Sequence, residues 1–272
     1  MKFETLNIRE EGAVIFAEIT APPMNLLGPE LVRDLVELIK STEANPSAKV
    51  LVFKSADPDY FISHVDVTRI KELRAETTKL VSEGSLALLL HHVSSSRLVT
   101  IAQIAGRVRG VGSEFALACD MRFAARESAL FGQFEAAFGV IPGAGGAQHL
   151  VRLMGRARAL EVMLSADDYD ADLAERYGWI NRALPAAELD EFVAALARRI
   201  ARIPDAGRAV VKDRVNAFAL VPSDEVRRDS NLFIEGLGNP QAQSRLREAL
   251  QKGMQTRQGE LRFPLLLDGL SG

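Results

Sequence analysis

Two glutamates, Glu114 and Glu135, are the residues whose type and surroundings could do chemistry. Glu114 follows Gly110 and Gly112 at the expected start of a helix, where backbone N–H groups have no partner within the helix and the helix dipole is positive. Because glycines relieve steric limits on the backbone, these N–H groups can turn outward towards a developing oxyanion. Glu135 follows about twenty residues later. Two carboxyl groups beside exposed amides are the parts needed to transfer protons at a carbon next to a carbonyl.

Each glutamate also has a simpler explanation. The helix dipole favours a glutamate in the first turn by about 0.3–1 kcal/mol, which would account for Glu114 without catalysis. Glu135, taken alone, is typical of an acidic side chain in a surface loop. The glycine spacing around Glu114 and the Phe-Gly-Gln-Phe run before Glu135 favour the functional explanation.

Other reactive groups form no comparable pattern. The single cysteine, Cys119, lies in an apolar run typical of core packing, and one cysteine excludes an internal disulfide. His91, His92 and His149 lack the spacing of metal ligands, so we expect no metal site. The glycines at 143, 145 and 146 are not followed by Lys-Ser/Thr and do not form a nucleotide phosphate loop. We expect them to let the loop after Glu135 close tightly.

The segments that position the glutamates predict an α/β protein. Residues 101–104 form a short apolar strand, a helix starts near residue 112, and residues 129–131 form another strand shortly before Glu135. The predicted segments upstream are a hairpin of residues 2–8 and 13–19, a helix over 29–42, a strand over 50–53 and a turn over 55–61. A strand, helix, strand order implies right-handed crossovers in nearly all cases.

Helical segments dominate the remaining chain. Residues 68–93 are helical in character, with a charged first half and an apolar second half. Further helices are predicted over 147–154, 156–164, 170–177, 187–203, 205–219, 224–237 and 239–254, with a short extended piece at 179–185. Gly155 separates the first two of these helices. The C-terminal third is therefore expected to be nearly all helix.

Length and charge limit the class of protein. The chain has 272 residues, of which 47% are hydrophobic, so it can bury a sizeable core. A formal net charge of −3 argues against a nucleic-acid surface. The N-terminus has no apolar signal region, and no apolar run reaches the ~18 residues that span a bilayer. We expect a cytoplasmic protein that binds neither nucleic acid nor membrane.

Three spaced motifs around the glutamates resemble a known family. G-R-V-R-G-V-G-S-E-F-A-L-A-C-D begins at Gly106, F-G-Q-F-E ends at Glu135, and G-V-I-P-G-A-G-G-A-Q begins at Gly139. Together they resemble the crotonase (enoyl-CoA hydratase/isomerase) superfamily, most strongly over residues 101–185. The resemblance implies an α/β fold, a crotonase-like spiral of ββα units with a helical C-terminal region. Residues 1–200 would be the spiral core, and residues 201–272 would cover the pocket and mediate oligomerisation.

The resemblance also implies a set of site residues. Glu114 and Glu135 would be catalytic, and the backbone N–H groups of Val65 and Val111 would form the oxyanion hole. The residues implied in substrate binding are Leu26, Ser63, His64, Asp66, Val67, Gly110, Phe134 and Gly143. Backbone atoms near Val65 would also hold the adenine end of coenzyme A.

Two of these positions depart from the family pattern. Val111 stands where the middle residue of a glycine triplet is usual, and a β-branched residue is strained there if its φ is positive. His64 replaces a usual glycine. Its side chain either turns away from the site or acts as a local donor that alters substrate or reaction. Arg107 and Arg109 flank the glycine loop and either meet coenzyme A phosphates or lie solvated on the surface.

The function implied by the resemblance is hydration of a 2-enoyl-CoA. The substrate would be an acyl-CoA thioester, with no separate cofactor, and the protein would form a homotrimer or homohexamer. One alternative is Δ3–Δ2 isomerisation or another reaction through a CoA-enolate, which in the family commonly needs only one acid. A second alternative is a CoA-binding or scaffold protein without catalysis. Retention of both Glu114 and Glu135 favours the hydratase.

Overall fold

The computed structural model describes residues 2–270, so residues 1 and 271–272 at the ends of the two predicted regions lie outside it. Two sheets make up the β structure of this part of the chain. The six-stranded sheet has the order β1-β2-β3-β5-β7-β10, and the four-stranded sheet has the order β4-β6-β8-β9. The strands are Leu6–Glu11 (β1), Val14–Ile19 (β2), Val50–Ser55 (β3), Tyr60–Ile62 (β4), Val99–Ile104 (β5), Arg107–Arg109 (β6), Met121–Ala125 (β7), Leu130–Gly132 (β8), Tyr169–Asp170 (β9) and Arg182–Leu184 (β10).

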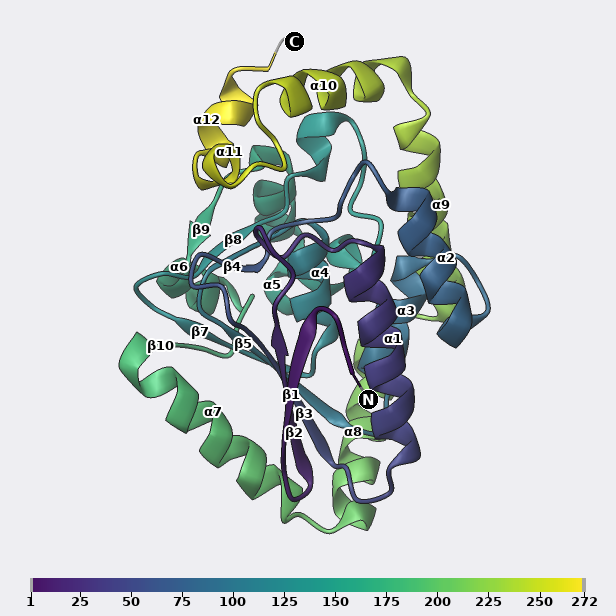
Figure 1. Cartoon of the computed structure of the whole chain (residues 1–272), viewed down its shortest axis with the longest axis vertical. Helices are drawn as coiled ribbons and strands as arrows, with labels where there is room; N and C mark the ends of the chain where they lie inside the picture. Colours follow the sequence, from purple (N-terminus) through teal and green to yellow (C-terminus); the bar gives the residue numbers. More distant parts are fainter. Residues whose placement is uncertain (1, 271–272) are drawn as a thin grey trace.

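The helices surround these sheets (Figure 1). They are Pro29–Ala44 (α1), Ile70–Val81 (α2), Leu86–Ser95 (α3), Val111–Ala118 (α4), Gly146–Ser165 (α5), Ala171–Tyr177 (α6), Ala186–Ala201 (α7), Asp205–Ala219 (α8), Ser223–Leu237 (α9), Pro240–Gln251 (α10), Arg257–Leu261 (α11) and Phe263–Asp268 (α12). A 3₁₀ turn, Glu135–Phe138 (η1), precedes α5. The C-terminal region is helical, as predicted.

A repeated ββα turn builds the spiral. Strand β3 leads into β4 and then α2 and α3, strand β5 leads into β6 and α4, and strand β7 leads into β8, η1 and α5. The first strands of the three turns pair in parallel in the six-stranded sheet, and the second strands pair in parallel in the four-stranded sheet. The predicted crotonase-like spiral is therefore confirmed. Its geometry brings the ends of β4, β6 and β8 side by side.

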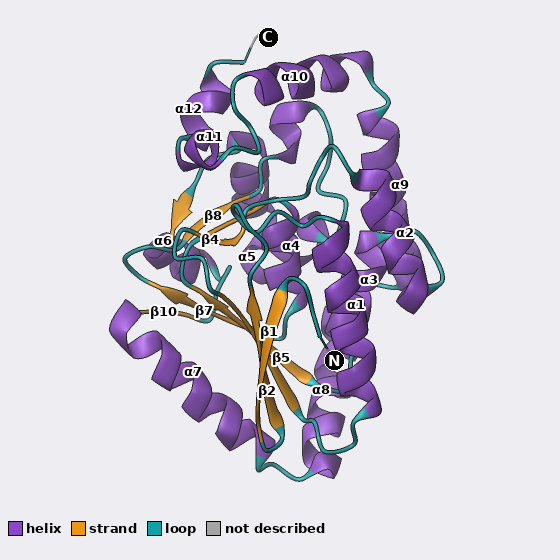
Figure 2. Ribbon diagram, viewed as in Figure 1, coloured by secondary structure: helices purple, strands orange, loops and turns teal. Residues whose placement is uncertain are grey.

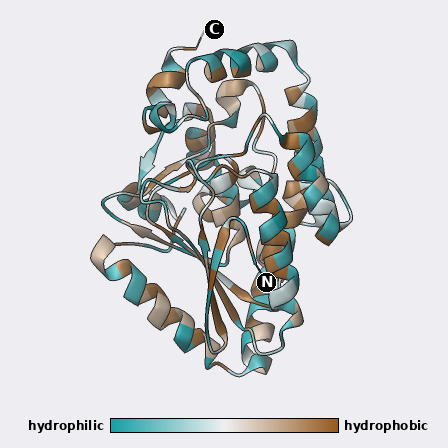
Figure 3. Ribbon diagram, viewed as in Figure 1, coloured by the Kyte–Doolittle hydropathy of each residue, from teal (hydrophilic) through white to brown (hydrophobic). Residues whose placement is uncertain are grey.

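Helices cover both faces of the six-stranded sheet, which explains why its inner strands are apolar on both sides. Val50 and Val52 of β3 pack against Leu189 and Val193 of α7. Leu51 and Phe53 point to the opposite face, into the larger core that includes α1 and α4. Figure 2 shows α7 on one side of this sheet and α1 on the other. In Figure 3 the apolar residues concentrate on the central strands, whereas α10 is largely hydrophilic.

Several segment predictions are confirmed and others are wrong. The break at Gly155 is confirmed, because this residue has φ 79° and ψ 163° inside α5. The predicted turn over 55–61 contains the start of β4, which is too short to show a pattern and exists because it pairs with β6. The predicted helix over 68–93 is two helices, because Ser82 adopts a positive φ of 61° and ends α2. Helices α11 and α12 were not predicted.

Candidate active site

A cavity lies where the four-stranded sheet, α4 and the C-terminal helices meet. Nine of the predicted site residues line it: His64, Val65, Val67, Gly110, Val111, Glu114, Phe134, Glu135 and Gly143. The other three, Leu26, Ser63 and Asp66, are not among the lining residues. Residues that are far apart in the sequence therefore meet at one place.

Glu114 lies in the first turn of α4 and is 2% exposed. Its Oε1 accepts hydrogen bonds from the backbone N–H groups of Ala144, at 2.7 Å, and Gly146, at 2.8 Å. Gly146 begins α5, and a Cβ there would lie 2.9 Å from Pro142, so glycine allows this loop to close on the carboxyl group. The Oε2 atom of Glu114 has no hydrogen-bond partner among residues 2–270.

Glu135 begins η1, three residues after Gly132 ends β8, and is 8% exposed. The Nε2 of Gln133 donates to its carboxyl oxygens at 3.0 and 3.1 Å. Burial is the main cause that raises the pKa of both Glu114 and Glu135 above the usual glutamate value. The charge of Glu135 raises the pKa of Glu114 further, while hydrogen bonds to each carboxyl group oppose the rise. Two such groups titrate as a pair and can hold one proton between them near neutral pH.

Val111 is the first residue of α4, so its N–H has no partner within the helix. The positive φ at this turn, 51°, belongs to Gly110 and not to Val111. A β-branched residue is therefore unstrained at position 111, and the strain considered from the sequence does not arise. Val111 and Gly110 both line the cavity.

Val65 lies in the loop between β4 and α2, held against the segment that precedes α1. Leu27 donates its N–H to the carbonyl of His64 at 2.8 Å and accepts from the N–H of Asp66 at 3.1 Å. The N–H of Val65, between these two bonds, has no acceptor among residues 2–270. Val65 and Val111 thus both line the cavity, and no hydrogen bond within residues 2–270 uses either backbone N–H group.

The His64 side chain contacts the C-terminal region of the chain. His64 is 1% exposed and lines the cavity, and its Nε2 lies 2.8 Å from Oε1 of Glu260 in α11. Arg109 is neither a solvated charge nor a phosphate ligand in this structure, because it is 1% exposed and pairs with Asp168. Its Nη1 also donates to the carbonyl of Glu260 at 2.9 Å.

The residues that do not line the cavity support its walls. Asp66 accepts hydrogen bonds from Thr68 and from Nε2 of Gln255, the latter at 3.0 Å. Ser63 is fully buried, and its hydroxyl has no partner among the described residues. Leu26 precedes the Leu27 bridge and is partly buried.

Most of the remaining cavity lining is apolar. The side chains that line it come from α2, α3, η1, α9, α10 and the segment after α10, namely Ile70, Leu86, Phe138, Phe233, Ile234, Leu237, Leu246 and Met254. A polar end with two carboxyl groups and free amides therefore continues into a space suited to an apolar chain. The sequence led us to expect that residues 201–272 cover the pocket, but it singled out none of these side chains, because the apolar faces of α9 and α10 are typical of any packed helix.

Neither a metal site nor a membrane span is found between residues 2 and 270. No group of three or more His, Cys, Asp or Glu side chains in this range is arranged to hold a metal ion. None of the helices there is both long and apolar enough to cross a bilayer.

The family model for enoyl-CoA hydratase/isomerase matches residues 9–259. The chain is 31% identical over 238 residues to a Rhizobium meliloti (strain 1021) protein named "Probable enoyl-CoA hydratase", covering 86% of this chain and 90% of that protein. A crystal structure of a candidate enoyl-CoA hydratase from Streptomyces avermitilis is 48% identical, with a TM-score of 0.97 over 100% of this chain and 99% of that one. Methylmalonyl-CoA decarboxylase shares the fold, at 18% identity and a TM-score of 0.79 over 92% of this chain and 97% of that one. With its ββα spiral and a family match over nearly its whole length, the chain belongs to the crotonase superfamily, as an enzyme of the enoyl-CoA hydratase/isomerase family.

Proposed function

We propose that the protein hydrates the 2,3 double bond of a 2-enoyl-CoA thioester. The observation that carries this proposal is that two buried glutamates and two free backbone N–H groups line one cavity with an apolar extension. The apolar part would hold the acyl chain. Coenzyme A arrives as part of the substrate, so no other cofactor is needed.

The thioester oxygen would lie between the N–H groups of Val65 and Val111. In water addition, negative charge moves onto this oxygen as the enolate forms, and donors already in place stabilise it without reorganisation. One such donor is typically worth about 10²–10³ in rate. Support for this assignment is that Val65 and Val111 both line the cavity and that neither N–H group is used by the fold.

The two glutamates would divide the proton transfers. One carboxylate takes a proton from water as the water oxygen bonds to Cβ, and the other carboxyl group, assigned here to Glu135, gives its proton to Cα. Passage of one proton between the carboxyl groups then restores the pair. Support comes from the raised pKa of both groups, because hydration needs one ionised and one protonated carboxyl group at the same pH. An isomerase of this family commonly needs only one acid.

The test is loss of conjugated-enoyl absorbance with a panel of short, medium and aromatic 2-enoyl-CoAs. We expect turnover by the wild type and a loss of roughly 10²–10⁴-fold in both Glu114→Gln and Glu135→Gln, because each removes one positioned proton transfer. Binding of the coenzyme A ester should persist in both variants, since neither carboxyl group is assigned to the coenzyme.

Exchange of Cα hydrogen with deuterated solvent separates the rival reactions. Glu114→Gln should retain this exchange and Glu135→Gln should lose it, if Glu135 acts at Cα. Wild-type exchange without any hydration would contradict the hydratase and indicate an isomerase or another enolate reaction. Absence of coenzyme A ester binding would favour the scaffold alternative.

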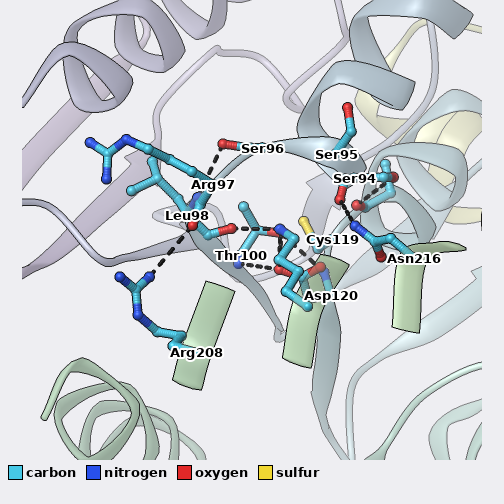
Figure 4. A network of polar contacts seen from close by, with 12 residues as sticks. Ser94, Ser95, Ser96, Arg97, Leu98, Thr100, Cys119, Asp120, Arg208 and Asn216 are labelled. Atoms are coloured by element: carbon cyan, nitrogen blue, oxygen red, sulfur yellow. Dashed lines mark hydrogen bonds and ion pairs between the residues drawn. The ribbon is translucent and has the colours of Figure 1, made fainter. Parts of the chain in front are cut away.

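We also infer that the protein self-associates through α8, as a trimer or pair of trimers. The polar face of this helix points into the protein, and its apolar face points outwards. Arg208, Lys212 and Asn216 point inwards, and Lys212 contacts Asp120 at 2.8 Å. Figure 4 shows Asn216, which donates to the carbonyl of Ser94 at 3.0 Å. Its apolar residues Val211, Val215 and Phe218 are 64%, 58% and 79% exposed. An apolar face left in water favours contact with another copy of the chain.

A further inference from the structure

We propose that residues 255–260 are a clamp that positions the Val65 N–H, with His64 and Glu260 as its positioning pair. The inference rests on the proposed function in taking that N–H as an oxyanion donor. None of the clamp residues is assigned to contact with the reacting atoms. They act by fixing the backbone on both sides of Val65.

The clamp holds the loop at three points. On one side of Val65, Nε2 of His64 lies 2.8 Å from Oε1 of Glu260. On the other side, the side chain of Gln255 donates to Asp66 at 3.0 Å and accepts from the N–H of Val67 at 2.8 Å. Gln255 also donates its own N–H to Oε1 of Glu260 at 2.9 Å, which joins the two arms.

His64 contacts the oxyanion loop directly as well. Its Nδ1 lies 2.7 Å from the carbonyl oxygen of Val65 and can only donate to it. This bond orients the peptide that follows Val65, while Leu27 accepts from the next N–H along the chain. The imidazole ring is therefore fixed between a carbonyl and a carboxyl group, and its position determines where Val65 lies.

The charges around His64 and Glu260 keep the Glu260 carboxyl group ionised. Glu260 is fully buried, and burial would raise its pKa, but the charge and hydrogen bond of His64, the Gln255 amide and the charge of Arg109 hold the pKa below the usual value. Arg109 in turn forms an ion pair with Asp168. A carboxylate that is buried and hydrogen-bonded in this way is rigid, because each partner loses a charged contact if it moves. A glycine at position 64 could make none of these contacts.

The experiment compares two ligands that differ only at the carbonyl: butyryl-CoA, which has the thioester oxygen, and S-butyl-CoA, a thioether that lacks it. The ratio of their affinities, measured by calorimetry, reports the oxyanion contact. The test variant is H64G/E260Q, which removes the pair without leaving a lone buried carboxylate. We expect the thioester preference to fall about tenfold or more and kcat for hydration to fall by roughly 10–100-fold, since small misplacement of a catalytic group has effects up to about 10².

Two further variants show that the effect belongs to the clamp. Glu260→Gln alone keeps an amide that can still hydrogen-bond to His64, so it should retain most of the thioester preference. H92A/E43Q removes another histidine–glutamate contact, at 3.0 Å between α1 and α3 and not in the cavity lining, and should leave preference and kcat unchanged.

The affinity for S-butyl-CoA distinguishes positioning from general damage. It should stay within about threefold of wild type in H64G/E260Q, because the thioether does not use the oxyanion hole. An equal loss of both affinities would mean that the pair only supports the pocket, and an unchanged preference would also overturn the clamp. A wild type that prefers butyryl-CoA but hydrates nothing would contradict the proposed function and leave the clamp intact.

Discussion

At the scale of single residues, the paired burial of Glu114 and Glu135 makes stability depend on pH. Both pKa values are raised in the folded protein above the usual 4.5. The folded state therefore binds more protons than the unfolded state between pH 4.5 and the raised values, and the free energy of unfolding falls as pH rises through that range. A shift of one pKa unit corresponds to about 1.4 kcal/mol.

In the variant E114Q/E135Q the free energy of unfolding should not fall in this way as the pH rises. Urea unfolding at pH 5, 6, 7 and 8 should show that the variant gains stability relative to wild type at each step upward. Glu188→Gln, in an exposed part of α7, is the matched control and should follow the wild type. A constant difference between E114Q/E135Q and wild type across the series would contradict the raised pKa values.

A residue of the candidate site could be predicted from the sequence only where the residues that mark it lie close to it in the chain. Glu114 and Glu135 could be found because glycines beside them in the sequence mark the local turns. His64 was noticed as a departure, but its partner Glu260 lies 196 residues away, and no local pattern connects the two. Gln133 is close to Glu135, yet a glutamine carries no sign of which way its amide points. Contacts that depend on tertiary structure alone were therefore missed.

At the scale of elements, close packing of α4 on β4 determines where the Val111 N–H lies. A Cβ at Gly112 would lie 2.2 Å from the carbonyl oxygen of Ile62, so only glycine lets the two elements meet. Gly112→Ala should destabilise the protein by about 1–3 kcal/mol or more, measured by urea unfolding, because the backbone has to move.

Gly207→Ala in α8 is the control for this substitution. No atom lies within 4 Å of a Cβ at Gly207, so alanine should instead stabilise the helix by about 0.5–1 kcal/mol. If both variants changed stability equally, the packing explanation for Gly112 would be wrong.

The elements themselves were predictable in proportion to their length. Helices such as α8 carry a periodic pattern over several turns, and α8 has the predicted bounds, Asp205–Ala219. Strands β4 and β6 have three residues each and form through pairing with one another, so neither shows a pattern of its own. Helix α11 has five residues and is likewise too short to show a pattern of its own.

At the scale of the whole molecule, the outward apolar face of α8 predicts self-association. V211E/V215E places two charges on this face, and both positions are exposed, so the single chain should fold normally. Light scattering after gel filtration should give a multiple of 29.7 kDa for wild type and a smaller assembly for the variant. Leu164→Glu, at a leucine 68% exposed on α5, should keep the wild-type mass. A wild type of 29.7 kDa would contradict the inference.

The contact between His64 and Glu260 also has a consequence for the protein while it is being made. On a ribosome the loop at residues 64–67 emerges long before residues 255–260, which complete its hydrogen bonds. The ββα spiral can form early from contacts among its own strands, whereas this loop stays without its C-terminal partners until synthesis is nearly finished. We therefore expect nascent chains to have a folded core and an incomplete site, with activity beginning only after the last helices dock.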